Sequence, residues 1–263
     1  IANPTMFAEW LSIISKKETV LAMTNVRQVP LYHYSFSTYL ESNLKRMKDT
    51  SAIDFIKQNS NKLIELKDKT FSDQAYNTIL KLKQYMYANN IKPSKKQVIN
   101  KIVNYLIKNN LTPAICFIFS RKEVERFASM IQFNLHKDHK KIEQVNQECK
   151  KIIMKLPNYK EYLLLQEYND LINLIERGIG IHHSGMIPIF REIVELMFDK
   201  GYIELLFATE TFAVGLNMPT KTVLFTSLEK YSENGFRYLY SHEYTQQAGR
   251  AGRRGYDNKG VVI

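Results

Sequence analysis

The sequence predicts an α/β protein with a mostly parallel sheet flanked by helices, and two observations support this class. Continuous apolar runs, such as residues 114–119, are typical of strands that are buried on both faces of a parallel sheet. These runs alternate with amphipathic patterns of helical length, as in repeated strand–helix–strand units. Loops at the carboxyl ends of such strands commonly bind ligands, so the residues there are the first candidates for function.

The elements at the N-terminal end are the least regular. Asn3 followed by Pro4 indicates the start of a helix. An apolar helical stripe follows on Phe7, Trp10, Leu11 and Ile14. Residues 19–23 and 31–36 are short strand candidates.

Residues 38–111 form the most basic part of the chain, with 14 Lys and Arg against 6 Asp and Glu. We interpret residues 38–93 as a basic helical linker or insertion. Charged stretches of this kind are more often solvated faces without a specific ligand, and we favour that interpretation here.

From Ser94 onward the alternation of helical and strand patterns is clearer. Ser94 is a candidate N-cap for a helix with an apolar face formed by Val98, Ile99, Ile102, Val103, Leu106 and Ile107. The strand over 114–119 comes next. We then predict helices over 121–133, 140–155 and 159–177, a strand over 179–181, a helix over 188–200 closed by Gly201, strands over 202–208 and 222–227, a helix over 244–253 and a strand over 260–263.

The composition favours a polyanionic partner. The net charge is +11 with a sequence pI of about 9.4, and nucleic acid is the usual partner of such a protein, although some basic proteins have none. The two cysteines, Cys116 and Cys149, have neither metal-site nor disulfide spacing, so we expect no metal site and a reducing, intracellular setting. No apolar stretch approaches the length of a membrane span. Ile1 is not a natural first residue, so we expect the natural chain to start upstream.

The stretch over residues 246–255, QQAGRAGRRG, carries the clearest candidate chemistry. Arg250 and Arg253 are spaced i, i+3 and would share a face if the segment were helical. Gly249 and Gly252 would allow a phosphate or a backbone to approach closely. Two guanidinium groups on one rigid element suit phosphoryl transfer. A basic surface loop or an RNA-binding arginine–glycine patch would explain the same residues.

Polar residues follow three predicted strands, at the places where ligand loops are expected. Ser120 and Arg121 begin a helix and could hold a phosphate at its N-terminus, although a capping serine before arginine is common. The loop GIHHSG could cradle a phosphate near Gly185, or be a structural turn. Its adjacent histidines should point to opposite faces. Thr209, at the end of the strand over 202–208, could reach a nucleic-acid phosphate.

Residues 231–240 contain Asn234-Gly235 between extended arms, which predicts a β-hairpin. Phe236, Tyr238 and Tyr240 would then share one face. That face could stack on nucleic-acid bases, or it could pack onto the domain as such stripes more often do.

Four long segments, in order, resemble the motifs of the second RecA-like domain of superfamily 2 helicases over about residues 94–263. They are PAICFIFSRKEVERFA, RGIGIHHSGMIPIFREIVELMF, LLFATETFAVGLNMPTKTVLFTS and EYTQQAGRAGRRGYDNKGVVI. The segments ATETFAVGLNMP and GRAGRRG are similar to the corresponding motifs of the superkiller-type, exosome-associated DExH RNA helicases. Residues 1–37 resemble the C-terminal end of the first RecA-like domain, whereas residues 38–93 depart from the family in length and sequence.

The resemblance implies roles for individual residues. Arg250 and Arg253 would be arginine fingers on the γ-phosphate, and Gln246 would orient the nucleotide or the attacking water. Gly215, Asn217 and Gly249 would line the ATP cleft. The hairpin would separate strands during 3′-to-5′ movement of the motor. The residues that would grip the RNA backbone are Ser120, Arg121, His183, Ser184, Gly185, Thr209 and Thr211. Implied partners are single-stranded or partly duplex RNA and the RNA-decay exosome or adaptor proteins, with no membrane.

Two features of a complete ATP site do not occur in this sequence, namely G-x-x-x-x-G-K-[ST] and an Asp followed by Glu. In the family, ATP and Mg²⁺ are bound mainly by the first RecA-like domain, so we expect the isolated chain to be inactive as an NTP hydrolase. A DNA helicase of the same superfamily and a non-catalytic nucleic-acid-binding scaffold remain alternatives at this stage.

Overall fold

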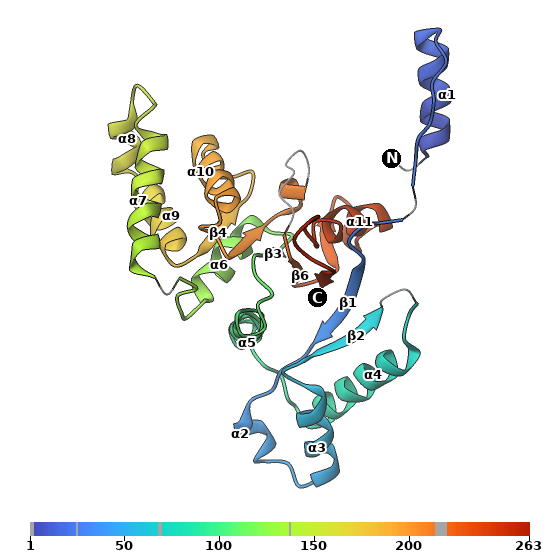
Figure 1. Cartoon of the computed structure of the whole chain (residues 1–263). Helices are drawn as coiled ribbons and strands as arrows, with labels where there is room; N and C mark the ends of the chain where they lie inside the picture. Colours follow the sequence, from blue (N-terminus) through green and yellow to red (C-terminus); the bar gives the residue numbers. More distant parts are fainter. Residues whose placement is uncertain (1–2, 25, 68–69, 137, 214–219) are drawn as a thin grey trace.

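The computed structural model of the chain describes residues 3–24, 26–67, 70–136, 138–213 and 220–263. Its central feature is a seven-stranded sheet with strand order β2-β1-β9-β6-β3-β5-β4 (Figure 1). The strands are β1 (Leu31–Phe36), β2 (Leu63–Lys67), β3 (Ala114–Phe117), β4 (Ile179–His182), β5 (Leu205–Ala208), β6 (Thr222–Phe225) and β9 (Gly260–Val262). Neighbouring strands are parallel except for the antiparallel pair β1–β2. The predicted class, an α/β fold with a mostly parallel sheet, is confirmed.

Helices cover both faces of the sheet because side chains alternate along its buried strands. In β3, Ile115 and Phe117 pack on one side with α7 (His139–Ile153), α9 (Gln166–Glu176) and α10 (Pro188–Asp199). Ala114 and Cys116 pack on the other side with α5 (Lys95–Lys108) and α6 (Arg121–Met130). The continuous apolar run of β3 is therefore explained by burial on both faces.

Two local sequence signals behave as expected. Ser94 caps α5 by accepting a hydrogen bond from the Gln97 backbone N–H, and the Gln97 side chain returns the bond to complete a capping box. Gly201 follows α10 with a φ of +75°, the left-handed conformation that glycine adopts readily at the end of a helix.

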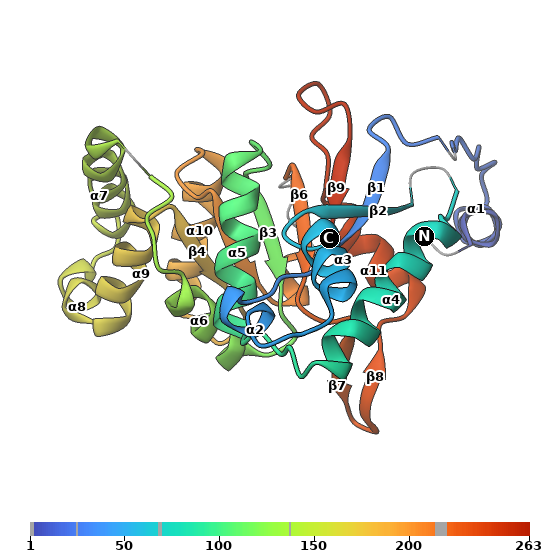
Figure 2. The same cartoon turned by 90° about the horizontal axis from the view of Figure 1, so that it is seen from below.

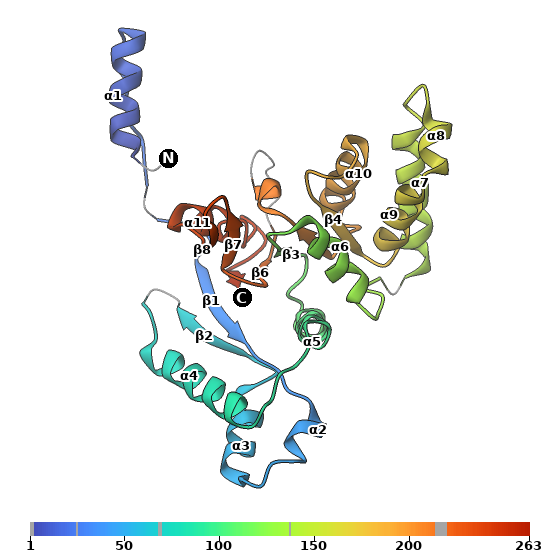
Figure 3. The same cartoon turned by 180° about the vertical axis from the view of Figure 1, so that it is seen from behind.

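The N-terminal residues differ in part from the prediction. Helix α1 (Pro4–Ser15) is capped by Asn3 and extends away from the rest of the molecule, with none of its described residues buried (Figure 3). The strand predicted over residues 19–23 is wrong, because this segment forms no strand. β1 is confirmed, and it pairs with β9 inside the seven-stranded sheet.

The basic segment over 38–93 is helical, as expected, and it also contributes a strand. It contains α2 (Glu41–Leu44), α3 (Thr50–Asn59), β2 and α4 (Asp73–Ala88). A small separate core joins Leu44, Ile56, Leu82 and Ile91. Because β2 pairs with β1, this segment contributes the outermost strand on one side of the main sheet.

The remaining elements adjust the predicted boundaries. The helix predicted over 159–177 is two helices, α8 (Tyr159–Leu164) and α9, because Leu165 is extended between them. This break lets Leu163 and Leu165 pack against the same core as α9. The strands β7 (Glu229–Ser232) and β8 (Gly235–Tyr238) form a separate sheet, and α11 (Ser241–Ala248) follows them. Among the described residues, no helix is both long and apolar enough to cross a membrane.

Candidate functional site

The candidate residues gather at two opposite edges of the sheet, one formed by the carboxyl ends of its parallel strands and the other by their amino ends. Ser120 follows β3, Ser184 follows β4 and Thr209 follows β5, and the carboxyl ends of these parallel strands share one edge. The segment after α11, which carries the two arginines, lies at the other edge. There Ala251 forms a parallel bridge with Thr220, just before β6 begins. We call residues 249–257 the arginine loop.

The arginine loop is not helical, so the helix predicted over 244–253 is wrong in its second half. α11 ends at Ala248, and Gly252 has a φ of +87°. The backbone of Thr220 forms hydrogen bonds with groups of this segment that would bond within the helix if α11 were longer. Its N–H donates to the Arg250 carbonyl at 2.9 Å, and its carbonyl accepts from the Gly252 N–H at 2.6 Å. Arg250 and Arg253 therefore do not share a helical face.

Arg27 fixes the start of the arginine loop, although nothing in the sequence singled it out. Its Nη2 donates to the carbonyl of Gly249 at 2.9 Å and to that of Ala251 at 2.6 Å. Its Nε donates to the carbonyl of Val29 at 2.7 Å. Burial lowers the pKa of Arg27 from its usual value. A lone arginine in an irregular segment has no local pattern that would reveal a partner so distant along the chain.

Asp257 holds Arg253 in a two-pronged ion pair, and sequence reasoning also missed this partner. Arg253 Nε lies 2.8 Å from Asp257 Oδ2, and Nη2 lies 3.0 Å from Oδ1. The hydrogen bonds that Arg253 donates to Asp257 raise the pKa of Arg253. Arg253 Nη1 takes no part in this pair. The carboxylate therefore orients the guanidinium through Nε and Nη2, and Nη1 points away from Asp257.

The structure describes some of the other residues that were predicted to bind a nucleotide. Arg250 is half-buried, and burial lowers its pKa. Gln246 is exposed on α11, and Gly249 lies so close to α11 that a Cβ there would approach the Thr245 carbonyl to 2.8 Å. Gly215 and Asn217 lie outside the described residues.

At the opposite edge, Ser120 and Arg121 are exposed at the start of α6. Ser120 is the N-cap, and its Oγ accepts a hydrogen bond from the Glu123 N–H at 3.4 Å. The first N–H groups of a helix and an adjacent arginine form a favourable environment for an anion. The sequence prediction of a capped helix at this position is confirmed.

His183 orders the turn that contains Ser184 and Gly185. The Gly185 N–H donates to His183 Nδ1 at 3.2 Å, so the imidazole proton lies on Nε2, which faces Glu125 Oε1 at 3.2 Å. Burial lowers the pKa of His183, although Glu125 acts in the opposite direction. Because both ring nitrogens have partners within the protein, His183 is placed to shape the turn, and direct contact with nucleic acid stays a prediction.

The loops after β3 and β4 lie side by side. A Cβ on Gly185 would come within 3.3 Å of Arg121 Cδ, so the arginine stem lies against the glycine backbone. Ser184 and Gly185 are exposed beside it. Burial is the main cause that lowers the pKa of His183, and the charges of Arg121 and Arg191 act in the same direction. Arg191, in α10, was missed because its surroundings look like an ordinary amphipathic helix.

The two histidines point to opposite sides of β4, as predicted. His182 is buried, and its Nε2 lies 2.7 Å from Glu195 Oε1. Thr209 is also buried, and its N–H donates to the His182 carbonyl at 3.1 Å. Thr211 belongs to a short 3₁₀ helix, η1 (Glu210–Ala213), and its side chain lies outside the described part of the structure.

The predicted hairpin is confirmed, with arms that begin two residues earlier than expected. Residues 233–234 connect β7 to β8, and Gly235 has a φ of +96° at the start of β8. The hairpin projects from the body of the domain (Figure 2). Phe236 is 78% exposed and Tyr238 is 71% exposed. These aromatic side chains are therefore not core residues, which removes the packing alternative.

A cavity of about 1050 Å³ lies beside the hairpin at the same edge of the sheet as Ser120. Tyr231 and Phe236 of the hairpin line it together with Lys95 of α5 and Phe225 at the end of β6. This cavity places aromatic and basic side chains next to the exposed loops after β3.

Comparison with known proteins identifies related sequences. Residues 140–255 match the family described as the helicase conserved C-terminal domain. The whole chain is 37% identical over 268 residues to exosome RNA helicase MTR4 of Mus musculus, of which it covers 24%. It is 34% identical over 280 residues to DExH-box ATP-dependent RNA helicase DExH10 of Arabidopsis thaliana, again over the whole chain and 26% of that protein.

A third relative is antiviral helicase SKI2 of Saccharomyces cerevisiae, which is 46% identical over 171 residues, 65% of this chain and 13% of that protein. The chain thus spans about a quarter or less of the length of these curated relatives. The matches to MTR4 and DExH10 include the basic segment over 38–93.

Proposed function

Since the chain belongs to the superkiller-type DExH RNA helicases and carries their helicase C-terminal domain, we propose that it is the second motor domain of an ATP-dependent RNA helicase. One observation carries the proposal. The arginine loop holds the Arg253 guanidinium and the Arg250 backbone in a fixed place at one edge of the sheet, while exposed polar groups occupy the other edge. A helicase motor needs both sites in one rigid unit.

The arginine loop fits the terminal phosphates of a nucleotide. Asp257 binds two nitrogens of Arg253 and leaves Nη1 outside the ion pair, and Thr220 holds the backbone of Arg250. We propose that both arginines act as arginine fingers, which stabilise the negative charge that develops on the γ-phosphate. Gln246 would orient the nucleotide or the attacking water. Gly215, Asn217 and Gly249 would line the same cleft.

Bound ATP would supply the phosphoryl group, and Mg²⁺ would neutralise part of its negative charge. We assign them mainly to a first RecA-like domain, because this chain has neither a P-loop nor a DExH box. We propose residues 1–37 as the end of that domain, 38–93 as a linker and 94–263 as the second domain, with β1 and β2 extending the sheet of the second. The isolated chain should therefore not hydrolyse ATP.

The opposite edge is suited to a nucleic-acid backbone. Its exposed groups include the Ser120 hydroxyl, the Arg121 guanidinium and the Ser184–Gly185 turn, and such groups bind phosphates without reading sequence. Thr209 and Thr211 would extend this contact, with His183 shaping the turn. We propose that single-stranded RNA binds across this edge and that the motor moves along it from 3′ to 5′. The exposed hairpin would then act as a wedge that separates strands.

The decisive experiment uses the full-length protein. RNA should stimulate its ATPase activity, and it should open RNA duplexes with a 3′ overhang in preference to those with a 5′ overhang. Faster opening of matched DNA duplexes would favour a DNA helicase instead. A protein that binds RNA but shows no RNA-stimulated ATPase would be a scaffold. Intracellular RNA decay with exosome or adaptor proteins would be the expected setting.

A further inference from the structure

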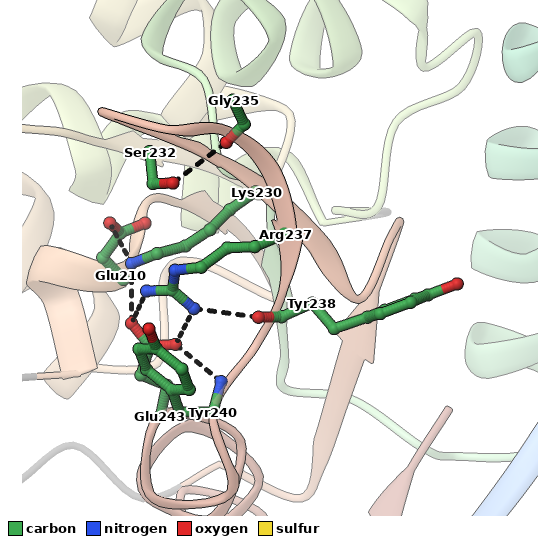
Figure 4. A network of polar contacts seen from close by, with 8 residues as sticks. All are labelled: Glu210, Lys230, Ser232, Gly235, Arg237, Tyr238, Tyr240 and Glu243. Carbon is green, nitrogen blue, oxygen red and sulfur yellow. Dashed lines mark hydrogen bonds and ion pairs between the residues drawn. The ribbon is translucent and has the colours of Figure 1, made fainter.

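Four charged residues tie the hairpin to two other parts of the domain (Figure 4). They are Glu210 of η1, Lys230 of β7, Arg237 of β8 and Glu243 of α11, and we call them the hairpin cluster. Lys230 Nζ lies 2.8 Å from Glu243 Oε1 and 3.3 Å from Glu210 Oε1. Lys230 and Arg237 are direct cross-strand neighbours, so the cluster draws on both arms of the hairpin.

Glu243 is the centre of this cluster. Arg237 Nη1 and Nη2 each donate to one of its oxygens at 2.8 Å. The Tyr240 N–H donates to Oε2 at 2.8 Å, as in a capping box at the start of α11. Hydrogen bonds from Arg237, and then from Lys230, hold the pKa of Glu243 far below its usual range, although burial acts in the opposite direction.

Charge rather than apolar packing orients the hairpin. The aromatic face with Phe236 and Tyr238 is exposed, whereas on the other face the Lys230 side chain is only 15% exposed and that of Glu243 only 17%. Half-buried ion pairs are screened less by salt than surface pairs, and a two-pronged arginine–carboxylate pair also fixes geometry. The cluster is therefore placed to set the angle at which the hairpin leaves the domain.

The partners of the cluster connect both edges of the sheet. Glu243 lies in the first turn of α11, and this short helix ends at Ala248, immediately before the arginine loop. Glu210 directly follows Thr209, which hydrogen-bonds to the end of β4. The contacts around the arginine loop keep its shape, so the loop and this short helix would shift together when the nucleotide site closes. This shift would carry Glu243 and, through its ion pairs, the hairpin.

We propose that Glu243 is a positioning residue that couples the arginine loop to the hairpin, so that closure around the nucleotide changes the angle of the strand-separating element. This inference rests on the proposed function. It adds a connection between the two ends of α11, in which the hairpin is moved by charge pairs and not by direct contact with the nucleotide.

The test compares Glu243→Gln with Glu148→Gln in the full-length protein. Glutamine keeps the size of the side chain but removes the charge that binds Lys230 and Arg237. Glu148 is a matched control, because it also pairs with two cations, Lys151 and Lys200, but it lies in α7 away from both edges. The readouts are RNA-stimulated ATPase, base pairs opened per ATP hydrolysed, and melting temperature.

We expect Glu243→Gln to lower the base pairs opened per ATP by about tenfold, within the range of typical coupling between sites, and to leave the ATPase rate unchanged. Glu148→Gln should leave both unchanged. The coupling is wrong if Glu243→Gln opens as many base pairs per ATP as the wild type. It is equally wrong if ATPase and unwinding fall together with the melting temperature, because that marks a structural role.

Hydrogen exchange separates this inference from the proposed function. In the wild type, a non-hydrolysable ATP analogue should alter amide exchange in residues 228–240, and in Glu243→Gln this response should be lost. A persistent response in Glu243→Gln overturns the coupling even if the protein proves to be no helicase. Absence of RNA-stimulated ATPase in the wild type would instead overturn the proposed function alone.

Discussion

The two edges of the sheet are built in opposite ways. At the arginine-loop edge, functional groups are held from several sides: Arg27 binds two carbonyls of the loop, Thr220 binds its backbone, and Asp257 binds Arg253. At the strand-end edge, the corresponding groups stand on the surface. Ser120 and Arg121 are exposed there, as is the Ser184–Gly185 turn.

This difference matches the demands of the two proposed ligands. Stabilising the charge of a transition state requires donors that are already in place before the reaction, because reorganisation at that moment would add to the barrier. A nucleic-acid backbone that slides past the domain requires exposed groups that bind any sequence and release it again. The rigid edge is therefore suited to chemistry, and the open edge to movement along a strand.

The largest expected effect comes from the rigid edge. Arg250→Ala or Arg253→Ala in the full-length protein should lower RNA-stimulated ATPase by about 10³-fold or more, the usual effect of losing an arginine finger. RNA binding without nucleotide should change little, since neither arginine lies at the strand-end edge. Steady-state ATPase and RNA titrations measure the two effects separately.

The neighbouring Arg254 supplies the control for this prediction. It is exposed in the same loop, so Arg254→Ala removes one positive charge without removing a proposed finger. ATPase that survives within a few-fold in Arg250→Ala, or that falls equally in Arg254→Ala, would show that the assignment of the fingers is mistaken.

The second prediction concerns the open edge. Replacing residues 231–236 with a short Gly-Ser turn should leave RNA-stimulated ATPase nearly intact and abolish strand separation, because the wedge is lost while Lys230 and Arg237 stay in place. Phe236 is exposed, so removing it should not disturb the core. Unwinding and ATPase are compared in the same folded variant; a proportional loss of both would contradict the wedge.

Much of the fold could be predicted because the relevant signals are local. The capping box at Ser94, the apolar run of β3 and the glycine after α10 each lie within a few residues of the structure that they specify. The order of strands and helices from residue 94 onward follows from these signals. The Asn-Gly signal likewise located the hairpin, although its arms begin earlier than expected.

The features that could not be predicted depend on distant partners. Residues 249–253 have the spacing of a helix, but the backbone of Thr220 competes for their hydrogen bonds and ends α11 at Ala248. Arg27 and Asp257 contact the arginine loop and Arg253 only in the folded chain, so their roles could not be predicted from the sequence. β2 forms an edge strand within a segment that its charge made look like a helical linker.

The third prediction tests how far the rigidity of the arginine loop depends on Arg27. Arg27→Met keeps much of the apolar stem but removes hydrogen bonds to two loop carbonyls. Charged hydrogen bonds contribute about 1.5–3 kcal/mol each, so partial loss of loop order should lower ATPase by about tenfold to a hundredfold. RNA binding should be unchanged.

Arg177→Met is the matched control for Arg27. Arg177 also donates to backbone carbonyls, those of Ile131 and Phe133, but these carbonyls follow α6 and do not belong to the arginine loop. Both variants should lose similar stability, measured by thermal unfolding, and only Arg27→Met should lose ATPase. Equal ATPase loss in the two variants would mean that general destabilisation, rather than loop order, limits the activity.

The smallest expected effect belongs to the open edge, where each group contributes little alone. Arg121→Gln should weaken binding of single-stranded RNA a few-fold and reduce the slope of log affinity against log salt by about 0.7, the release of one counterion. Arg126→Gln changes the same charge in the same helix, but Arg126 is paired with Glu123 at 3.0 Å. Its salt slope should stay at the wild-type value. If Arg126→Gln lowered the slope as much as Arg121→Gln, the domain would bind RNA through its general positive charge, and the open edge would lose its special role.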